Sequence, residues 1–188
     1  NITYNRYVNS VGTNEWDLIG SPVDGQSISS FASANSSTLG TSSNIYAIGS
    51  YDNATNTWTN YTTSTIGSAG NFDRGRGYQM ASVSDGTGIL KFTGTPASTT
   101  QTQAIINNDA ANAGTGKRWN LVANPFPSYI HGNTNAHATN NFLTVNTDKL
   151  HDSYEAIYGY DADGSGYTAY NNTSSALNLA PGQAFMVA

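Results

Sequence analysis

The stretch WNLVANPFPS, residues 119–128, decides how this chain is organised, because a close counterpart, WDLIGSP, occupies residues 16–22. In both stretches Trp is followed by a polar residue, then by Leu and a β-branched residue, and Pro comes shortly afterwards. Short runs of β-branched and aromatic residues that end at Pro or Gly are typical of strands. A pattern that occurs twice in one chain indicates an internal repeat.

Two further pairs of segments support the repeat. The segment IYAIGSYDNATNTWTNY, residues 45–61, resembles IYGYDADGSGYTAY, residues 157–170. The segment RGRGYQMA, residues 74–81, resembles APGQAFMVA, residues 180–188. The members of each pair occur in the same order about a hundred residues apart, which is the signature of a duplicated unit.

The spacing of these pairs predicts one domain with internal duplication over residues 1–188. Repeat 1 is expected to cover about residues 3–100 and repeat 2 about residues 101–188. Two such units can pair their sheets around a pseudo-twofold axis and bury a common core. The segments of variable length between the matched stretches are then loops.

Strand signals dominate the chain. In GILKFTG, residues 88–94, Leu90 and Phe92 alternate with Ile89, Lys91 and Thr93, which is the period of a half-buried strand. The other predicted strands are RYVNSV (6–11), WDLIG (16–20), IYAIGSY (45–51), GYQMASV (77–83), QAIIN (103–107), RWNLVA (118–123), AIYGYD (156–161) and QAFMVA (183–188). Helical periodicity occurs only at 28–34 and 140–150. The prediction is an all-β fold, a β-sandwich or jelly-roll-like fold built from two related half-units with a short helix in each.

Composition excludes several classes of function. The chain has no Cys, so neither a disulfide framework nor a zinc–thiolate site can form. Its net charge is −5, which disfavours nucleic acid and anionic membranes as partners. No apolar run approaches the length of a membrane span. The chain begins at Asn1 without a signal peptide, and we interpret it as a piece of a larger, exported protein.

The sequence favours a protein that is not an enzyme. Only His131, His137 and His151 could serve as imidazole bases, and all three lie in polar, loop-like sequence. A glycan hydrolase would need two carboxyl groups across a cleft. Most of the acidic residues occur in turns, where backbone hydrogen bonding explains Asp. Hydrolysis therefore stays a third alternative.

One turn has the pattern of a metal loop. In DADGSG, residues 161–166, the oxygens of Asp161, Asp163 and Ser165 have the spacing of the first half of a calcium loop. The acid expected at the twelfth position of such a loop is absent, because Asn172 stands there. A Gly-rich hairpin turn is the alternative interpretation. Calcium at this turn is the one cofactor candidate.

The aromatic residues fall into two groups. Trp16 and Trp119 each lie two residues before a Leu, on the same side of the strand, and are predicted to lie in the core. The core is also expected to contain Tyr78, Phe92, Phe142 and Phe185.

Trp58 is different, because it lies among Asn and Thr in NATNTWTNY, residues 53–61, and we expect it to be partly exposed. Sugars present CH-rich faces that stack on aromatic rings, and their hydroxyl groups bind Asn, Asp, Gln and Arg. Trp58 and Tyr61, together with Tyr167 and Tyr170 at the matched positions, are therefore predicted to bind a glycan, with packing at the rim as the alternative.

Basic residues are rare enough for their clusters to be informative. Arg74 and Arg76 flank Gly75, and Lys117 and Arg118 precede the second Trp. A guanidinium group binds sulfate or carboxylate through paired hydrogen bonds. Arg74 and Arg76 are predicted to contact a charged glycan. The alternative is a solvated strand end at which Asp73 neutralises Arg74.

The second half of the chain resembles a repeat of exported proteins in gliding, polysaccharide-degrading bacteria that use type IX secretion. The resemblance rests on WNLVANPFPSYI (119–130), IYGYDADGSGYTAYN (157–171) and LAPGQAFMVA (179–188). The first half matches less well, with Ser21-Pro22-Val23 where Asn-Pro-Phe is usual. The resemblance implies secretion or a cell-surface location and an ancillary, non-catalytic role beside a catalytic or adhesive module.

These observations together predict a non-catalytic carbohydrate-binding module that binds a polysaccharide through loop aromatics and polar side chains. An algal, sulfated galactan-type glycan is one candidate ligand. The alternative is a structural or adhesive spacer domain of a cell-surface protein, with no ligand of its own. Its partners are expected to be a polysaccharide and a covalently linked catalytic or adhesive module.

Overall fold

A computed structural model describes residues 1–10, 16–83, 87–110, 113–161 and 163–188 of the chain. The strands of residues 1–100 are β1 (Ile2–Tyr7), β2 (Asp17–Ile19), β3 (Thr41–Ser42), β4 (Ile45–Asp52), β5 (Thr57–Thr62), β6 (Tyr78–Met80) and β7 (Ile89–Gly94). Those of residues 101–188 are β8 (Asn120–Ala123), β9 (Ile130–His131), β10 (Ile157–Asp161), β11 (Gly166–Tyr170), β12 (Asn178–Leu179) and β13 (Ala184–Val187). The helices are α1 (Ile28–Ala34) and α2 (Phe142–Asn146), with 3-10 turns η1 (Ile66–Ser68) and η3 (Asp152–Tyr154).

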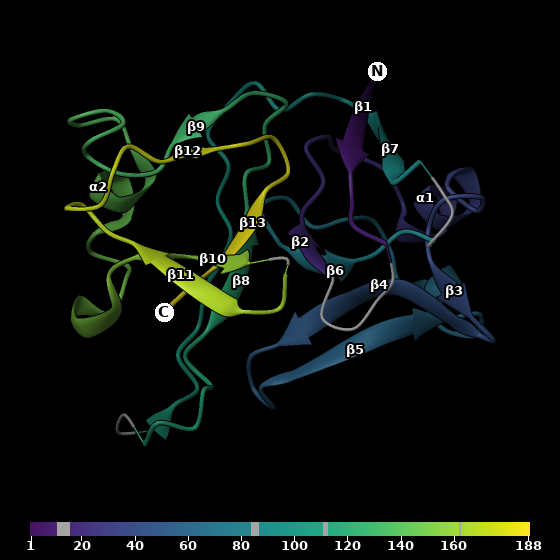
Figure 1. Ribbon diagram of the computed structural model, residues 1–188, viewed down its shortest axis with the longest axis horizontal. Coiled ribbons are helices and arrows are strands. Elements are labelled where there is room, and N and C mark those ends of the chain that lie inside the picture. Colours follow the sequence, from purple (N-terminus) through teal and green to yellow (C-terminus); the bar gives the residue numbers. More distant parts are fainter. Residues whose placement is uncertain (11–15, 84–86, 111–112, 162) are drawn as a thin grey trace.

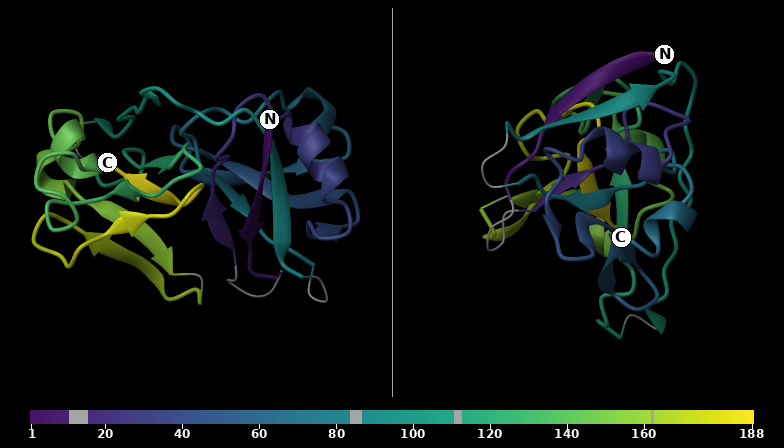
Figure 2. Two further views of the ribbon diagram at one scale, coloured as in Figure 1. Left: turned by 90° about the horizontal axis from the view of Figure 1, so that it is seen from above. Right: turned by 90° about the vertical axis from the view of Figure 1, so that its right-hand side faces the viewer.

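The protein is an all-β, sandwich-like protein with several antiparallel sheets and two short helices, as predicted. Figure 1 shows the strands of residues 1–100 on one side of the molecule and those of residues 101–188 on the other. Seen from above, the two groups of strands lie side by side (Figure 2). In the described part of the chain, no helix is long and apolar enough to cross a membrane.

The two predicted helices form where side chains cap them. The Ser30 backbone N–H donates to Ser27 Oγ at the start of α1, and the Thr144 N–H donates to Asn141 Oδ1 at the start of α2. Such caps satisfy donors that the first helical turn leaves without partners. α1 has the predicted bounds, whereas α2 ends at Asn146, earlier than predicted. The Asn146 side-chain amide donates to the Phe142 carbonyl there, so it competes with continuation of the helix.

The main sheets of the two halves have the same strand order. In the first half the order is β5-β4-β6-β2, with β3 also paired to β4, and in the second half it is β11-β10-β13-β8. The pairing register agrees as well: Leu18 pairs with Gln79, as Leu121 pairs with Met186. Each main sheet therefore places its matched segments in the same positions.

Each half has its own hydrophobic core, and a third cluster lies between them. Phe31, Phe72 and Phe92 form contacting rings in the first core. Phe185 is buried in the second core, where Phe142 packs edge-on against it and is only partly buried. The third cluster contains Leu18, Tyr51, Leu121, Ala123, Ala184 and Met186. It takes side chains from both halves, so it forms the packing between them.

Backbone hydrogen bonds connect the two halves reciprocally. The Gly20 N–H donates to the Gly182 carbonyl (2.9 Å), and the Ala123 N–H donates to the Gly75 carbonyl (2.8 Å). Gly20 and Ala123 are matched positions of the first sequence pair, and Gly75 and Gly182 are matched positions of the third. Each half thus donates to the other from the same place in its own sheet.

The neighbouring residues repeat this exchange. An isolated antiparallel bridge joins Ile19 to Gln183, and another joins Arg76 to Val122. β2 and β13 lie side by side at the centre of the molecule (Figure 1). Reciprocal contacts between matched positions are what a pseudo-twofold arrangement requires. Duplication of the sequence stays a prediction.

Two predicted strands differ from the structure. The first strand is β1, which begins at Ile2, shares only Arg6 and Tyr7 with the predicted RYVNSV, and pairs with β7. Val11 of that stretch lies outside the described residues. QAIIN forms no strand. The Asn120 side chain accepts from the Ile106 N–H (3.0 Å) and donates to the Ile106 carbonyl (2.9 Å). The Asn120 amide thus bonds the backbone N–H and carbonyl of Ile106, which would otherwise pair with a neighbouring strand.

The close approach of the halves predicts a strict size limit at Gly20. A Cβ atom there would lie 2.4 Å from the Ala123 Cβ and 2.6 Å from the Arg76 carbonyl oxygen. We expect Gly20→Ala to lower the free energy of unfolding by about 1–3 kcal/mol, the usual cost of overpacking. Denaturant unfolding measures this change.

Gly67→Ala is the matched control, because a Cβ atom at Gly67 meets nothing within 4 Å. Its stability should stay within about 0.5 kcal/mol of the wild type, as for ordinary surface substitutions. Equal effects of the two substitutions would contradict the close contact between the halves.

Candidate functional site

Two cross-strand aromatic pairs occupy the same position in the two halves. Tyr51 and Trp58 face each other across β4 and β5, with ring centroids 5.1 Å apart and planes inclined by 53°. Tyr160 and Tyr167 face each other across β10 and β11, at 5.3 Å and 58°. Aromatic pairs across antiparallel strands stabilise hairpins. Here they also bring rings from both halves to the junction.

A cleft of about 390 Å³ takes both rings of the first pair, and Tyr167 of the second, into its lining. Its lining residues are Tyr51, Asn56, Trp58, Trp119, Tyr158, Tyr167 and Met186. The volume falls within the range of about 300–1,000 Å³ that ligand sites occupy. Both halves contribute to the lining, so neither half alone would form the cleft. We call these seven residues the aromatic cleft.

The floor of the aromatic cleft is apolar and its walls are partly open. Met186 and Tyr51 are 6% and 7% exposed, and both belong to the cluster between the halves. Trp58 and Trp119 are half-buried, and Tyr167 is 46% exposed. Trp119 packs edge-on against Tyr158, with centroids 4.7 Å apart. Trp119 also packs against Tyr154, with centroids 5.8 Å apart, so contacts with two tyrosine rings fix its orientation in the wall.

The sequence predicted Trp119 to lie in the core. In the structure it forms a wall of the cleft instead. Leu121 of the same strand lies in the packing between the halves. Trp16, at the matched position, is also half-buried; it lines a separate groove together with Tyr46 and Asn60. Both Trp residues lie near the outer end of a short edge strand, where the core no longer covers them.

Asn56 supplies the amide of the cleft and is held in place. The Tyr51 hydroxyl donates to Asn56 Oδ1 (2.7 Å). Asn56 has a φ of 55°, in the left-handed region that Asn tolerates better than most residues. The side-chain amide of Asn53, in the same turn, donates to the Trp119 carbonyl (2.7 Å). The turn of the first half is therefore fixed against the Trp of the second.

A buried ion pair anchors the segment that precedes Trp119. Arg118 donates to Asp109 Oδ2 through Nε (3.1 Å) and Nη2 (2.7 Å), and both side chains are nearly inaccessible to solvent. The Arg118 guanidinium holds the pKa of the Asp109 carboxyl below its usual value. The same guanidinium lies over the Tyr154 ring, 4.8 Å from its centroid. The Arg118 guanidinium therefore has a structural role, in which it contacts Asp109 and Tyr154.

The phenols of the cleft stay neutral over a wide pH range. Burial, with smaller effects of Tyr160 and Tyr51, raises the pKa of Tyr167 to about 12. Burial also raises the pKa of Tyr51 and of Tyr158. A neutral phenol both donates and accepts a hydrogen bond. The cleft therefore offers hydroxyl groups that match those of an uncharged polar ligand.

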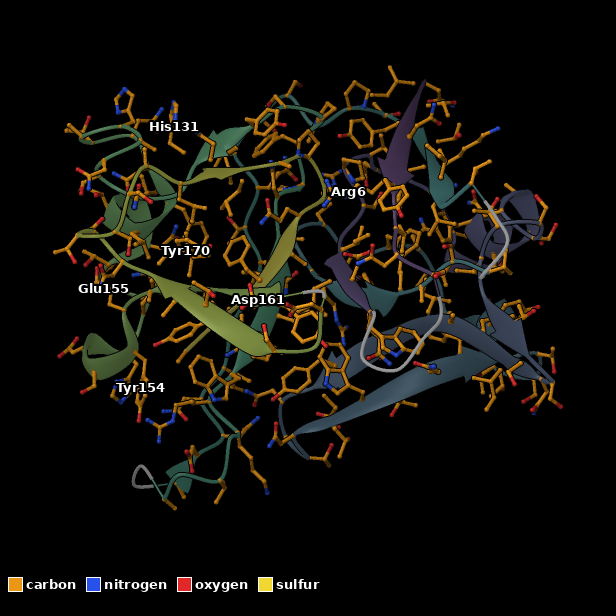
Figure 3. The ribbon with its side chains drawn as sticks, in the orientation of Figure 1. Arg6, His131, Tyr154, Glu155, Asp161 and Tyr170 are labelled. Atoms are coloured by element: carbon orange, nitrogen blue, oxygen red, sulfur yellow. The ribbon has the colours of Figure 1, made fainter. Side chains whose placement is uncertain are left out.

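The structure brings Trp58 and Tyr167 together in the cleft but not Tyr61 and Tyr170. Successive residues of a strand point to opposite faces, so residues three apart face opposite sides. Tyr61 packs against the first core and Tyr170 against the second. Figure 3 shows Tyr170 at the opposite end of the β10–β11 hairpin from Asp161.

The predicted basic site is occupied by ion pairs. Arg74 pairs with Asp24 and also donates to Gln101 (3.2 Å), so it is Asp24 and not Asp73 that neutralises it. Arg76 pairs with Asp73 (3.2 Å). Arg76 lines a smaller cavity of about 200 Å³ next to β4 and β8, and neither Arg lines the aromatic cleft.

The predicted calcium turn uses its oxygens locally. Asp161 Oδ2 accepts from the Thr168 hydroxyl (2.8 Å), and Asp163 Oδ1 accepts from the Ser165 N–H (2.9 Å). Ala162 lies outside the described residues. Within the described ranges no three His, Asp or Glu side chains form a group that could hold a metal ion. Calcium at this turn stays a prediction.

The histidines lie apart from the aromatic cleft. His131 Nδ1 hydrogen-bonds Asn178 Oδ1 (2.9 Å), and its ring stacks on that of His137. His151 caps η3, where its Nδ1 accepts from the Ser153 N–H (3.2 Å). Figure 3 shows His131 and Tyr154 at opposite sides of the second half. None of the three histidines lines the cleft.

No protein-family model, curated protein or solved structure matches this chain. The site must therefore be interpreted from its own geometry. The cleft residues that sequence analysis missed are Tyr51, Asn56, Trp119, Tyr158 and Met186. Tyr51 and Tyr158 could have been found, because both lie in the matched Tyr-Asp strands. No sequence pattern indicates Met186, because it reaches the cleft only through the packing between the two halves.

The tyrosine pKa values predict alkaline instability. Burial raises the pKa of Tyr78 from 10.0 to about 12, and that of Tyr167 similarly. The unfolded chain loses these protons near pH 10, whereas the folded chain keeps them. Stability should therefore be constant up to about pH 10 and fall as the pH rises towards 12. Thermal unfolding across this range measures it.

Tyr78→Phe provides the control, because it removes the most buried of these phenols. The variant should lose less stability between neutral and alkaline pH than the wild type. An unchanged melting temperature up to pH 12 in the wild type would contradict the assignment of raised pKa values.

Proposed function

We propose that this protein is a non-catalytic carbohydrate-binding module that binds a polysaccharide in the aromatic cleft. The observation that carries the proposal is the arrangement of five aromatic rings, from Tyr51, Trp58, Trp119, Tyr158 and Tyr167, around one open cleft between the halves. The cleft is preformed by the hydrophobic packing beneath it. A preformed site loses little conformational entropy on binding.

The chemistry of the lining supports a sugar ligand. Half-exposed rings offer apolar faces for the CH groups of a pyranose. The Asn56 amide and the Tyr hydroxyls offer donors and acceptors for its hydroxyl groups. A sugar has apolar CH groups and polar hydroxyl groups close together, so it can contact both the aromatic rings and the polar groups of the lining. An entirely apolar ligand would leave the polar groups of the rim without partners, which costs free energy.

The lining supports binding rather than hydrolysis. A glycosidase acts through a pair of carboxyl groups that flank the scissile bond. The seven residues of the aromatic cleft include no carboxyl group and no imidazole. Asp52, the nearest acid in sequence to Tyr51, uses its oxygens within its own turn, accepting from the Ala54 N–H and the Thr55 hydroxyl.

The wider setting is proposed from the sequence resemblance. We infer that the module is secreted or displayed at the cell surface, and that it is covalently linked to a catalytic or adhesive module. Its role there is to hold that module on a polysaccharide. The spacer alternative shares the same fold and setting, and it differs in having no ligand.

Affinity electrophoresis against a panel of neutral and sulfated polysaccharides tests the proposal. We expect retardation by at least one polymer, and Trp58→Ala should weaken binding by about tenfold or more, as for an aromatic hot spot. Trp119→Ala should have a similar effect, because the two rings come from opposite walls of one site.

Tyr129→Ala is the matched control, since Tyr129 is 69% exposed and lies outside the cleft. Its binding should equal that of the wild type. Absence of retardation by every polymer would refute the proposed function and favour the spacer. Release of reducing ends from the same polymers would instead favour the hydrolase.

A further inference from the structure

We propose that the glycan bound by the aromatic cleft is uncharged, and that sulfated or uronate-rich polymers are excluded. This inference rests on the proposed function, because it specifies the class of ligand for the same site. It departs from the expectation that Arg74 and Arg76 would contact a charged glycan. It is carried by the lack of charged side chains in the lining of the cleft and by the charged groups beside it.

The lining itself offers no cationic partner to an anion. The seven residues of the aromatic cleft include no Lys, Arg or His. The face of an aromatic ring carries the negative part of its quadrupole, so a sulfate or carboxylate placed over Trp58 or Trp119 is repelled. An anionic group that leaves water for such a site loses hydration without gaining a cationic partner.

The guanidinium groups nearest to the cleft are already paired. Arg76 donates to Asp73 and to the Tyr51 carbonyl (3.4 Å). Arg118 is buried and makes both of its described side-chain hydrogen bonds to one carboxylate oxygen of Asp109. An anionic ligand that approached either guanidinium would meet the carboxylate already paired with it, and the two negative charges would repel each other.

Lys117 is the remaining cation close to the cleft in sequence. It follows Gly116, where an added Cβ atom would meet the Asn56 side chain. Lys117 is not among the lining residues. Its charge therefore lies outside the lining, and it supplies a second variant for the test.

Carboxylates lie at the margins of the cleft. Asp52 follows Tyr51 directly, and hydrogen bonds from Thr55 and Ala54 hold the pKa of its carboxyl below the usual value, so it is ionised at neutral pH. Asp161 follows Tyr160 at the matched position of the other hairpin. Asp52 is adjacent in sequence to the cleft residue Tyr51, and Asp161 is three residues from the cleft residue Tyr158. Over such short separations, repulsion of an anion is only partly screened by salt.

A matched pair of ligands tests the inference directly. The probes are neutral galactan, glucan and xylan oligosaccharides and the chemically sulfated form of each, with affinities measured by calorimetry at low and high salt. We expect at least one neutral oligosaccharide to bind with an affinity independent of salt. Its sulfated form should bind about tenfold or more weakly, a loss of about 1.4 kcal/mol or more, because the sulfate loses hydration without gaining a cationic partner.

Three variants test which charged groups determine the preference for the neutral over the sulfated oligosaccharide. Arg76→Gln and Lys117→Gln should bind the neutral oligosaccharide as the wild type does. Asp52→Asn should improve binding of the sulfated form, because it removes an ionised carboxylate next to Tyr51. Circular dichroism and thermal unfolding establish that each variant is folded.

The inference and the proposed function fail in different ways. Tighter binding of a sulfated probe that weakens with salt, and that Arg76→Gln or Lys117→Gln abolishes, overturns the inference alone and leaves glycan binding in place. Binding of neither form of any probe overturns both. Binding of a neutral probe that Trp58→Ala does not weaken places the site elsewhere and also overturns both.

Discussion

The reciprocal backbone hydrogen bonds at the junction are the constraint on which the rest of the structure depends. Gly20 donates to Gly182 and Ala123 donates to Gly75, and the bridges beside them join the edge strand of each sheet to the segment that enters the central strand of the other. Without this exchange β2 and β8 would each leave unpaired backbone groups at a sheet edge, which invites aggregation. The exchange also demands small residues: a Cβ atom at Gly77 would lie 2.5 Å from Leu121 Cγ. The same small residues therefore allow both the close approach of the two backbones and the burial of the side chains between the halves.

The aromatic cleft is a consequence of this junction. Each hairpin carries a cross-strand aromatic pair whether or not the halves meet, because such pairs stabilise two-stranded ribbons. Only the junction brings Tyr51 and Trp58 into one cleft with Tyr167 and adds Trp119 to its lining. The Asn53 amide and the Arg118–Asp109 ion pair then hold the turn of the first half and the strand of the second in fixed relation. A binding site that two units build jointly gains rigidity from both, since its walls stand on sheets rather than on free loops.

Much of the fold is predictable from local pattern. The alternation in residues 88–94 appears as the alternating burial of β7, and the stretch at residues 28–34 forms α1 as expected. The prediction of QAIIN as a strand was wrong because Asn120 pairs with its backbone through a side chain, which composition does not reveal. At the site, the exposure of Trp58 followed from its polar neighbours. The faces of Tyr61 and Tyr170 could have been assigned from strand alternation, whereas the role of Trp119 could not, because it depends on which surface of its strand the other half covers.

The central claim is that Trp58 and Trp119, from opposite halves, bind one uncharged glycan. Two-dimensional NMR of the indole N–H groups tests it most directly, because the chain has only three Trp residues and Trp16 lies in a separate groove. Titration with a neutral oligosaccharide that binds should shift the Trp58 and Trp119 signals together, with a single binding constant, and should leave the Trp16 signal in place. A shift of Trp16 alone, or of Trp58 without Trp119, would contradict a site shared between the halves.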